Sequence, residues 1–374
     1  MNKKEISEIK KTLTPEQSVI TRICCCYVDG GKEIKFTSKD AFHSLSEEKA
    51  YRYFDIFRHT LSGTLGKNLI NMEFPVEEEM EGGKQDFLLK LRDSRLEDDS
   101  LLDEFYQNII EDYDSVSGFY IILIHAVYDV PGKSSDGSEL FDASDSVYDY
   151  LLCSICPVRL SKSGLSYNAD TNSISERVRD WIVGAPANGF LFPAFNDRDA
   201  DIHSLLYFSK NPEELQTEFI ENIFGSAAPM SAGNQKETFN NIITNTLGEE
   251  CDFNTIKTIH ETLNEMIEEN KDEPEPLVLT KNEVKHIFEE SSVPDEKINV
   301  LEKQLVETVG EKPAFIASNI TNVRQFNIKT PDVVIKVNPE RTDLIDTRVI
   351  DGQKCLIVTI SDQIEVNGIN VKEM

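Results

Sequence analysis

The residues whose spacing could support chemistry begin with a pair of cysteines. Cys153 and Cys156 are separated by two residues, which is the spacing of half a zinc site or of a redox dithiol. A four-ligand site needs a second pair, and only Cys24 and Cys26 offer one. The flanking residues predict a strand, in which positions i and i+3 project to opposite faces. We therefore interpret both thiols as core cysteines, with a metal or redox role as the alternative.

Two further stretches each resemble part of a binding loop. Residues 62–68 contain Gly-x-x-Gly-Lys, but a phosphate loop needs two more residues between the glycines and a hydroxyl residue where Asn68 stands. Residues 197–201 alternate acids like the start of a calcium loop, but Ile202 replaces its glycine and Phe208 its last acid. We expect a helix end followed by a turn in the first stretch, and a solvated acidic turn in the second.

The six histidines are scattered singly along the chain. His125 lies within an apolar predicted strand, where a hydrogen-bonded core histidine is commoner than a catalytic base. The nucleophile-elbow, His-Glu-x-x-His and Gly-x-Gly-x-x-Gly patterns do not occur in the sequence. We expect no catalytic residue, no cofactor and no metal. An enzyme that uses dispersed carboxylates, with or without a metal, remains an alternative.

The composition is strongly acidic. The chain carries 67 acidic and 38 basic residues, a net charge of -29, which repels phosphate backbones and anionic lipid at long range. The longest apolar run, Phe119–Val130, contains His125 and Asp129 and is too short to cross a bilayer. The first residues form a charged pattern without the apolar segment of a signal peptide, and the cysteine count of seven is odd. These features predict a cytosolic protein with reduced thiols.

The charge is uneven along the chain. Residues 321–360 contain six basic and five acidic residues, and residues 1–35 contain seven basic and five acidic residues. In these two stretches an anion meets the least repulsion. Solvated strand faces of mixed charge are the alternative explanation. The residues that we predict to bind nucleic acid are Arg324, Lys329, Lys336, Arg341 and Arg348.

The hydrophobic periodicity predicts an α+β protein with mostly antiparallel strands and a small C-terminal helix-plus-strand region. Helices are expected at residues 2–12, 85–93, 101–113, 212–224, 234–247, 254–269, 281–290 and 295–309, and between a capping box at Ser44–Glu47 and Gly63. Strands are expected at residues 19–28, 33–37, 118–130, 150–160, 164–167, 181–184, 190–195, 202–208, 323–328, 332–338, 344–350, 354–360 and 364–366. The connections between the strands look too short for most βαβ crossovers, which favours antiparallel pairing.

The chain is long enough for two or three domains. We expect an N-terminal α+β domain over residues 1–210 and a helical segment over residues 211–270. An acidic, proline-containing linker at residues 268–276 then leads into a C-terminal helix-plus-β domain, residues 271–374.

Five segments of the sequence are similar to a bacterial family of unknown function, catalogued as domain-of-unknown-function family 4317. They are Met1–Lys10, Leu61–Asn68, Leu151–Val158, Gly189–Phe195 and Thr330–Ile335. The resemblance extends over nearly the whole chain. The family has no established catalytic residues. The resemblance therefore implies membership of the family but no mechanism.

The order of the elements also resembles the family of 37-kDa nucleoid-associated proteins. The shared features are an apolar strand that ends near a histidine (Phe119–Tyr128), later helices, and a terminal β-hairpin region from Val323–Phe326 to Leu356–Val358. This resemblance implies a non-enzymatic, oligomeric protein that associates with DNA through its C-terminal basic residues. An acidic protein–protein adaptor or regulator, with a protein partner in place of DNA, is the alternative.

Overall fold

The computed structural model describes residues 1–133, 139–310, 315–360 and 364–371. Contacts divide the chain into two compact units, Met1–Ser231 and Ala232–Met374, which are described separately. The domain boundaries expected near residues 210 and 270 stay a prediction, because contacts within one chain do not test which segments fold on their own. None of the described helices combines the length and the apolar character that a bilayer crossing requires.

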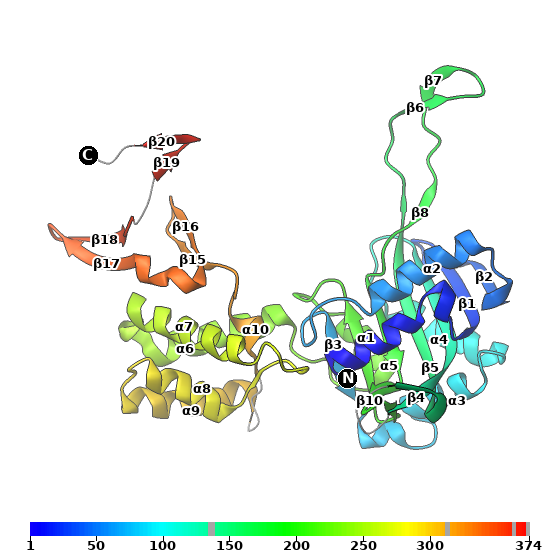
Figure 1. Ribbon diagram of the computed structural model, residues 1–374, viewed down its shortest axis with the longest axis horizontal. Helices are drawn as coiled ribbons and strands as arrows, with labels where there is room; N and C mark the ends of the chain where they lie inside the picture. Colours follow the sequence, from blue (N-terminus) through cyan, green and yellow to red (C-terminus); the bar gives the residue numbers. More distant parts are fainter. Residues whose placement is uncertain (134–138, 311–314, 361–363, 372–374) are drawn as a thin grey trace. The chain divides into compact units, whose positions relative to one another are not determined.

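An eight-stranded antiparallel sheet forms the centre of the first unit (Figure 1). Its strand order is β2-β1-β4-β5-β9-β12-β3, and β8 pairs with the C-terminal end of β5. Each ladder between neighbouring strands is antiparallel, which confirms the prediction from the short connections. The strands are β1 (Ile20–Val28), β2 (Ile34–Ala41), β3 (Leu69–Glu73), β4 (Phe119–Lys133), β5 (Glu139–Leu160), β8 (Trp181–Val183), β9 (Asn188–Phe192) and β12 (Ser204–Ser209).

Helices cover both faces of this sheet. On one face, Ile9 of α1 (Lys3–Thr12) and Phe57 of α2 (Glu47–Thr60) share a core with Ile124 of β4. On the other face, three helices share a core with Leu123, the neighbouring residue of β4. These helices are α3 (Lys84–Asp93), α4 (Asp99–Asp112) and α5 (Thr217–Phe224). Because successive strand residues point to opposite faces, one apolar strand serves both cores, and the unit is a mixed α+β sandwich of three layers.

The capping box predicted at Ser44–Glu47 is wrong. The helix α2 begins at Glu47 with Ser46 as its N-cap residue, and no side-chain capping hydrogen bond is present there. Ser44 ends a short 3₁₀ helix, η2 (Phe42–Ser44), and its hydroxyl donates to the carbonyl of Ala41 at 2.7 Å. The serine that the pattern selected therefore stabilises the preceding turn instead of the helix.

Other elements differ from the prediction mainly at their ends. The helix expected from residue 212 begins only at Thr217, and β5 begins at Glu139, eleven residues before the expected start at 150. The short strands β3, β7 (Ser173–Glu176) and β11 (Asp199–Asp201) were not predicted. Strands β7 and β11 carry few apolar residues, so alternation gives them little signal. In β3 the apolar residues Leu69, Ile70 and Met72 do not alternate strictly. Three further 3₁₀ helices are η1 (Pro15–Gln17), η3 (Val76–Glu79) and η4 (Gly248–Glu250).

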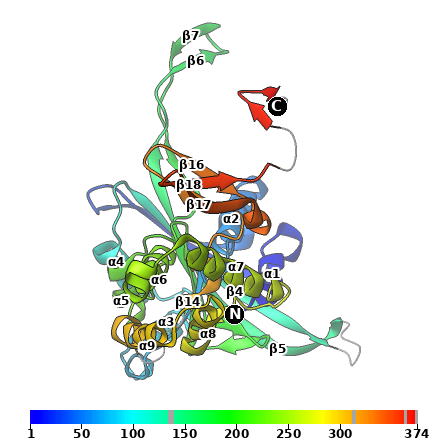
Figure 2. The same ribbon diagram turned by 90° about the vertical axis from the view of Figure 1, so that its left-hand side faces the viewer.

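Two hairpins extend from the central sheet. The pair β10 (Ala194–Asn196) and β11 forms a short one. The pair β6 (Leu165–Asn168) and β7 forms the tip of a longer one, and residues 161–164 and 177–180, which are not strand, connect it to the pairing of β5 with β8. We call residues 161–184 the arm. Figures 1 and 2 show the arm standing away from the layers of the first unit.

The second unit combines helices with small hairpins. Its buried side chains include Phe239, Leu263, Phe288 and Leu301, one from each of its four long helices. These helices are α6 (Ala232–Leu247), α7 (Phe253–Glu269), α8 (Lys281–Glu290) and α9 (Asp295–Val309), with the short α10 (Ala317–Ile320) and the pair β13 (Val278–Leu279) and β14 (Phe315–Ile316) beside them. Three hairpins follow: β15 (Phe326–Lys329) with β16 (Val334–Val337), β17 (Ile345–Ile350) with β18 (Gln353–Val358), and β19 (Ile364–Val366) with β20 (Ile369–Val371). The 3₁₀ helix η5 (Pro339–Leu344) lies between the first two.

Candidate nucleic-acid interface

The hairpin β15–β16 lies on helix α7 through its apolar side. The ring of Phe326 lies 6.4 Å from the ring of Phe253 and 6.1 Å from that of His260, centroid to centroid. His260 also forms a hydrogen bond of 3.0 Å between its Nδ1 and the hydroxyl of Thr321. Exposure alternates along both strands, so that Phe326 and Ile328 are half-buried and the residues between them are exposed. The hairpin therefore has an inner apolar face and an outer face on which the exposed Val334 lies beside polar residues.

The outer face of this hairpin carries two of the predicted lysines. Lys329 ends β15, and Lys336 of β16 is the register partner of Asn327, so all three side chains share one face. Arg324 lies in the turn just before β15, where its backbone N–H donates to Asn322. Within the described parts of the chain, Arg324, Lys329 and Lys336 make no ion pair. Residues 322–338 contain these three cations and one acid, Asp332.

The other two predicted residues are neutralised by local partners. In η5, Nε of Arg341 lies 3.1 Å from Oδ1 of Asp343, and a hydrogen bond from the guanidinium lowers the pKa of that carboxyl. In β17, Nε of Arg348 lies 2.9 Å from Oδ2 of Asp346, whose pKa is likewise lowered by this hydrogen bond. A guanidinium that already has a carboxylate partner must give it up or share it to bind a phosphate. The structure therefore separates the five candidates into three available cations and two paired ones.

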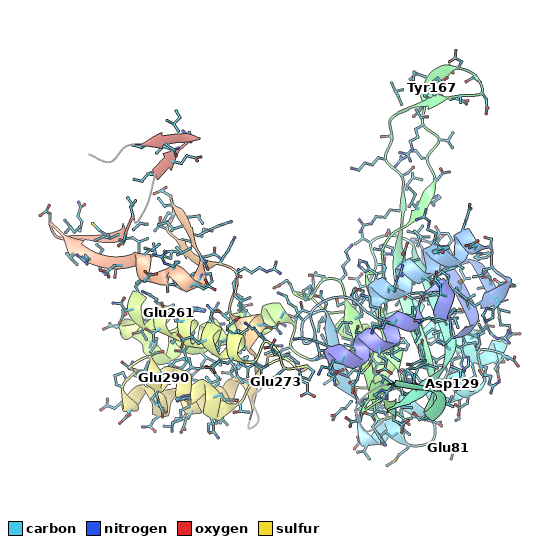
Figure 3. The ribbon with its side chains drawn as sticks, in the orientation of Figure 1. Glu81, Asp129, Tyr167, Glu261, Glu273 and Glu290 are labelled. Atoms are coloured by element: carbon cyan, nitrogen blue, oxygen red, sulfur yellow. The ribbon has the colours of Figure 1, made fainter. Side chains whose placement is uncertain are left out.

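The 3₁₀ helix η5, which precedes β17, is also held on α7. The hydroxyl of Thr342 in η5 donates to Glu261 of α7, which Figure 3 labels, and Ile345 at the start of β17 is buried. The three available cations all precede η5 in the chain, and Arg341 and Arg348 lie within it or after it. The region thus places hydrogen-bond donors and positive charge on the outer side of β15–β16, while its acids lie mainly on α7 and beside η5. A phosphate group could be bound on that outer side.

The cysteine pair is structural, as the strand argument predicts. Cys153 and Cys156 of β5 are both fully buried, but Cys153 belongs to the core under α4 and Cys156 to the core under α2. Burial raises the pKa of the Cys156 thiol to about 12 and that of Cys153 further. Across the described residues, no three His, Cys, Asp or Glu side chains gather in a way that could hold a metal ion.

The glycine-rich and acidic stretches are turns. In the first, the N–H groups of Lys67 and Asn68 donate to the carbonyl of Thr64, so they are not free for a phosphate. In the second, Asp197 and Arg198 have positive φ and connect β10 to β11. This second turn is more tightly held than a solvated acidic turn, because Arg198 pairs with Glu8 of α1 at 3.0 Å.

His125 is the predicted core histidine, but its surroundings could not be predicted from the sequence. Its Nδ1 lies 2.5 Å from the hydroxyl of Thr21 on β1, and its Nε2 lies 2.8 Å from Oδ1 of Asp149 on β5. This order of hydroxyl, imidazole and carboxylate is the one that activates nucleophiles in hydrolases. A catalytic imidazole must also pass the proton to a leaving group, however, and the ring of His125 has no exposed surface. We therefore assign this trio to the structure of the sheet.

A second set of cations, on the arm, was missed in the sequence. Lys162, Arg177 and Arg179 are exposed and, as far as the structure describes the chain, form no ion pair. Arg179 donates from Nε to the carbonyl of Ser161 at 2.8 Å. Three acids on the same arm cancel their charge, so a count along the chain gives no signal there.

The chain belongs to the family described as Domain of unknown function (DUF4317), whose model matches residues 1–369. No curated protein and no solved structure matches the chain. Nothing in these comparisons bears on the resemblance to the 37-kDa nucleoid-associated proteins. The family membership thus agrees with the sequence, and the function has to be argued from the residues themselves.

Proposed function

We propose that this member of the DUF4317 family is a non-enzymatic, cytosolic protein that associates with nucleic acid, with DNA as its first candidate. The phosphate contacts are made by Lys329 and Lys336 on the outer face of β15–β16 and by Arg324 beside it. The observation that supports the proposal best is that these three cations are exposed and lack acidic partners among the described residues.

The geometry of the hairpin suits a backbone contact. Lys329 and Lys336 lie on neighbouring strands and on one face, and Asn327 between them adds an amide that can donate to phosphate oxygen. Lysine binds phosphate as a point charge without demanding one orientation, which suits binding without sequence preference. The anchoring of Phe326 on α7 holds this face outward.

The overall charge sets the expected strength. A net charge of -29 opposes the approach of a polyanion, so the local cations must act at short range. We therefore expect weak binding that is strongest at low salt and disappears towards physiological salt. The negative charge of the other parts of the chain then limits the number of protein molecules that bind non-specifically to one DNA.

The proposal is tested by retardation of duplex DNA in a native gel at about 50 mM salt and micromolar protein, where non-specific binders are normally visible. The wild type is expected to shift the duplex. The double variant Lys329→Ala/Lys336→Ala is expected to bind about a hundredfold more weakly, because each of the two charge-assisted contacts contributes on the order of 1.5 kcal/mol and every 1.4 kcal/mol is about tenfold.

A matched control is the double variant Lys281→Ala/Lys303→Ala, which removes the same charge from the second unit. Both lysines line a shallow hollow on α8 and α9, together with Glu302 and Glu307, and lie away from the hairpins in the fold. The control is expected to bind like the wild type. Absence of any shift by the wild type contradicts the proposal, and so does an equal loss in the two double variants.

A further inference from the structure

The segment that leads into β15 is held on α7 at both of its ends. At the first end, the hydroxyl of the buried Thr321 lies 3.0 Å from Nδ1 of His260. At the second end, the ring of Phe326 meets the ring of the same histidine at an angle of 69°, with 6.1 Å between the centroids. One imidazole, next to Glu261 on α7 (labelled in Figure 3), therefore contacts both ends of this segment.

Arg324 lies between these two contacts. The four residues between Thr321 and Phe326 are all exposed. Their local hydrogen bonds remain within the segment, since the backbone N–H groups of Arg324 and Gln325 donate to the side chain and to the carbonyl of Asn322. The position of the Arg324 guanidinium, and of the hairpin that follows it, therefore depends on how the two ends of the segment are held.

The surroundings of His260 favour its neutral form. Burial lowers the pKa of this imidazole, and the positive charge of Lys236 on α6 lowers it further. Its ionisable neighbours on α7, Lys257 and Glu261, lie 3.8 Å apart and offset each other. Helix α10 carries no ionisable side chain, and β15 carries only Lys329, at the end that is farther from His260.

The other elements that pack on α7 are α8 and η5, and within the described ranges neither gives His260 an acidic partner. Most of their charged side chains have partners elsewhere: Lys285 with Glu289 and Glu302, His286 with Glu290, and Arg341 with Asp343. The others are Lys281 of α8, Glu340 of η5, and Glu283, which caps its own helix. An imidazolium at position 260 would therefore lie near a lysine without a compensating carboxylate.

We propose that neutral His260 positions the segment that leads into β15 for nucleic-acid binding, and that its protonation loosens this segment and weakens the binding. The proposal rests on the proposed function and adds a control by pH to the same site. Neutral His260, with its proton on Nε2, accepts the Thr321 hydroxyl at Nδ1. The imidazolium carries a proton on both nitrogens, so this acceptor is lost and a charge is placed near Lys236. Phe253 keeps its own contact with Phe326, so the hairpin loosens without leaving α7.

The linkage between protonation and loosening sets the direction of the effect. An imidazole that is released from these contacts has an ordinary pKa of about 6.5, which lies above the pKa of the held one. The loosened segment therefore binds more protons, and acid favours it. At pH 5.5, about one unit below 6.5, this linkage increases the loosened population by at most about tenfold. The direction is opposite to the general effect of acid, because protonation of other histidines adds positive charge and favours a polyanion.

The first measurement is amide hydrogen exchange of the full chain at pH 7.5 and 5.5, corrected for the intrinsic pH dependence of exchange. Peptides that cover residues 321–329 should lose protection in acid, by up to about tenfold. The variant His260→Asn should show no such loss, because its amide oxygen can accept the Thr321 hydroxyl and does not titrate. The matched control is His286→Asn, which removes an exposed histidine of α8 and should respond like the wild type.

The second measurement is the affinity of the same three proteins for duplex DNA at about 50 mM salt and at both pH values. We expect the wild type and His286→Asn to bind about threefold to tenfold more weakly at pH 5.5, and His260→Asn to bind no more weakly. An equal loss of protection in the wild type and His260→Asn overturns the proposal, as does wild-type binding that does not weaken in acid. A wild type that binds no duplex at pH 7.5 but loses protection in acid contradicts the proposed function, while the hold of His260 on the segment stands.

Discussion

The Nε2 atom of His125 lies 2.8 Å from Oδ1 of Asp149, across the ladder between β4 and β5. The two atoms are in contact but are not aligned as a regular hydrogen bond. The Thr21 hydroxyl contacts the other nitrogen of the ring. A fully buried imidazole thus has a polar contact at each nitrogen, one from each neighbouring strand.

The contact between His125 and Asp149 predicts that two acids near each other in the sheet respond differently to replacement by alanine. Asp149→Ala removes the carboxylate that contacts the buried Nε2 of His125, which we expect to lower the free energy of unfolding by about 1–3 kcal/mol. The control is Asp129→Ala, because Asp129 is an exposed acid on the same strand as His125 and should cost little. Urea denaturation of the full chain, followed by circular dichroism, measures both. Equal destabilisation by the two variants would show that the contact with His125 is not what matters.

Gly189 in β9 has no room for a side chain. A Cβ at this position would lie 2.4 Å from the carbonyl oxygen of Cys153 and 2.6 Å from Cγ2 of Thr60. We expect Gly189→Ala to destabilise the chain by roughly 2 kcal/mol or more, because the close atom is backbone and cannot move aside. Gly164→Ala on the arm is the control, since nothing lies within 4 Å of its Cβ. The midpoint of thermal unfolding compares them, and a neutral Gly189→Ala would contradict the packing of β9 on β5 and α2.

The seven cysteines should divide into two reactivity classes. Burial raises the pKa of Cys24 and Cys26 to about 12, and it also raises that of Cys25, Cys153 and Cys156. Cys251 is exposed and Cys355 is half-buried. Because the thiolate is the reactive form, we expect a disulfide reagent at pH 8 to titrate two thiols in the native protein and seven after denaturation. Three or more fast thiols in the native protein would contradict the two-core assignment.

His260 should make the second unit sensitive to mild acid. Burial lowers the pKa of this imidazole, and the charge of Lys236 lowers it further. A histidine whose folded pKa lies below its unfolded value of about 6.5 binds fewer protons when folded. Its contribution to stability is therefore complete above about pH 6.5 and is lost as the pH falls through the folded pKa.

We accordingly expect the thermal stability of the full chain to fall between pH 7.5 and 5.5, and His260→Gln to show a smaller fall. His286→Gln is the control, because His286 is an exposed residue of α8 that pairs with Glu290 at 3.3 Å. The pH dependence of the melting temperature of the three proteins is the measurement. If the His260 variant loses as much stability as the wild type, another group is responsible.

Local patterns were enough to predict much of the fold. The helices α8 and α9 begin and end at the predicted residues, since Thr280 provides a capping box for α8 and Pro294 precedes α9. The opposite faces of Cys153 and Cys156 also followed from strand geometry alone. Such features depend only on residues that are close in the sequence.

The contacts that could not be predicted from the sequence depend on strand register and on side-chain rotamers. The contact of His125 with Asp149 requires one particular pairing of β4 with β5, and a slip of one residue would move Asp149 to the other face. Likewise, the sequence treats Lys336 and Arg348 alike, although Arg348 has a carboxylate within reach and Lys336 has none among the described residues.

The central claim, that Lys329 and Lys336 contact phosphate, is tested most directly by the salt dependence of duplex DNA binding. The logarithm of the binding constant should fall linearly with the logarithm of salt concentration, with a slope of about 0.9 per neutralised phosphate. We predict that Lys329→Ala/Lys336→Ala lowers that slope by about two relative to the wild type, and that Lys281→Ala/Lys303→Ala leaves it unchanged. An unchanged slope in the first variant, or a wild type without measurable binding at 50 mM salt, would contradict the account.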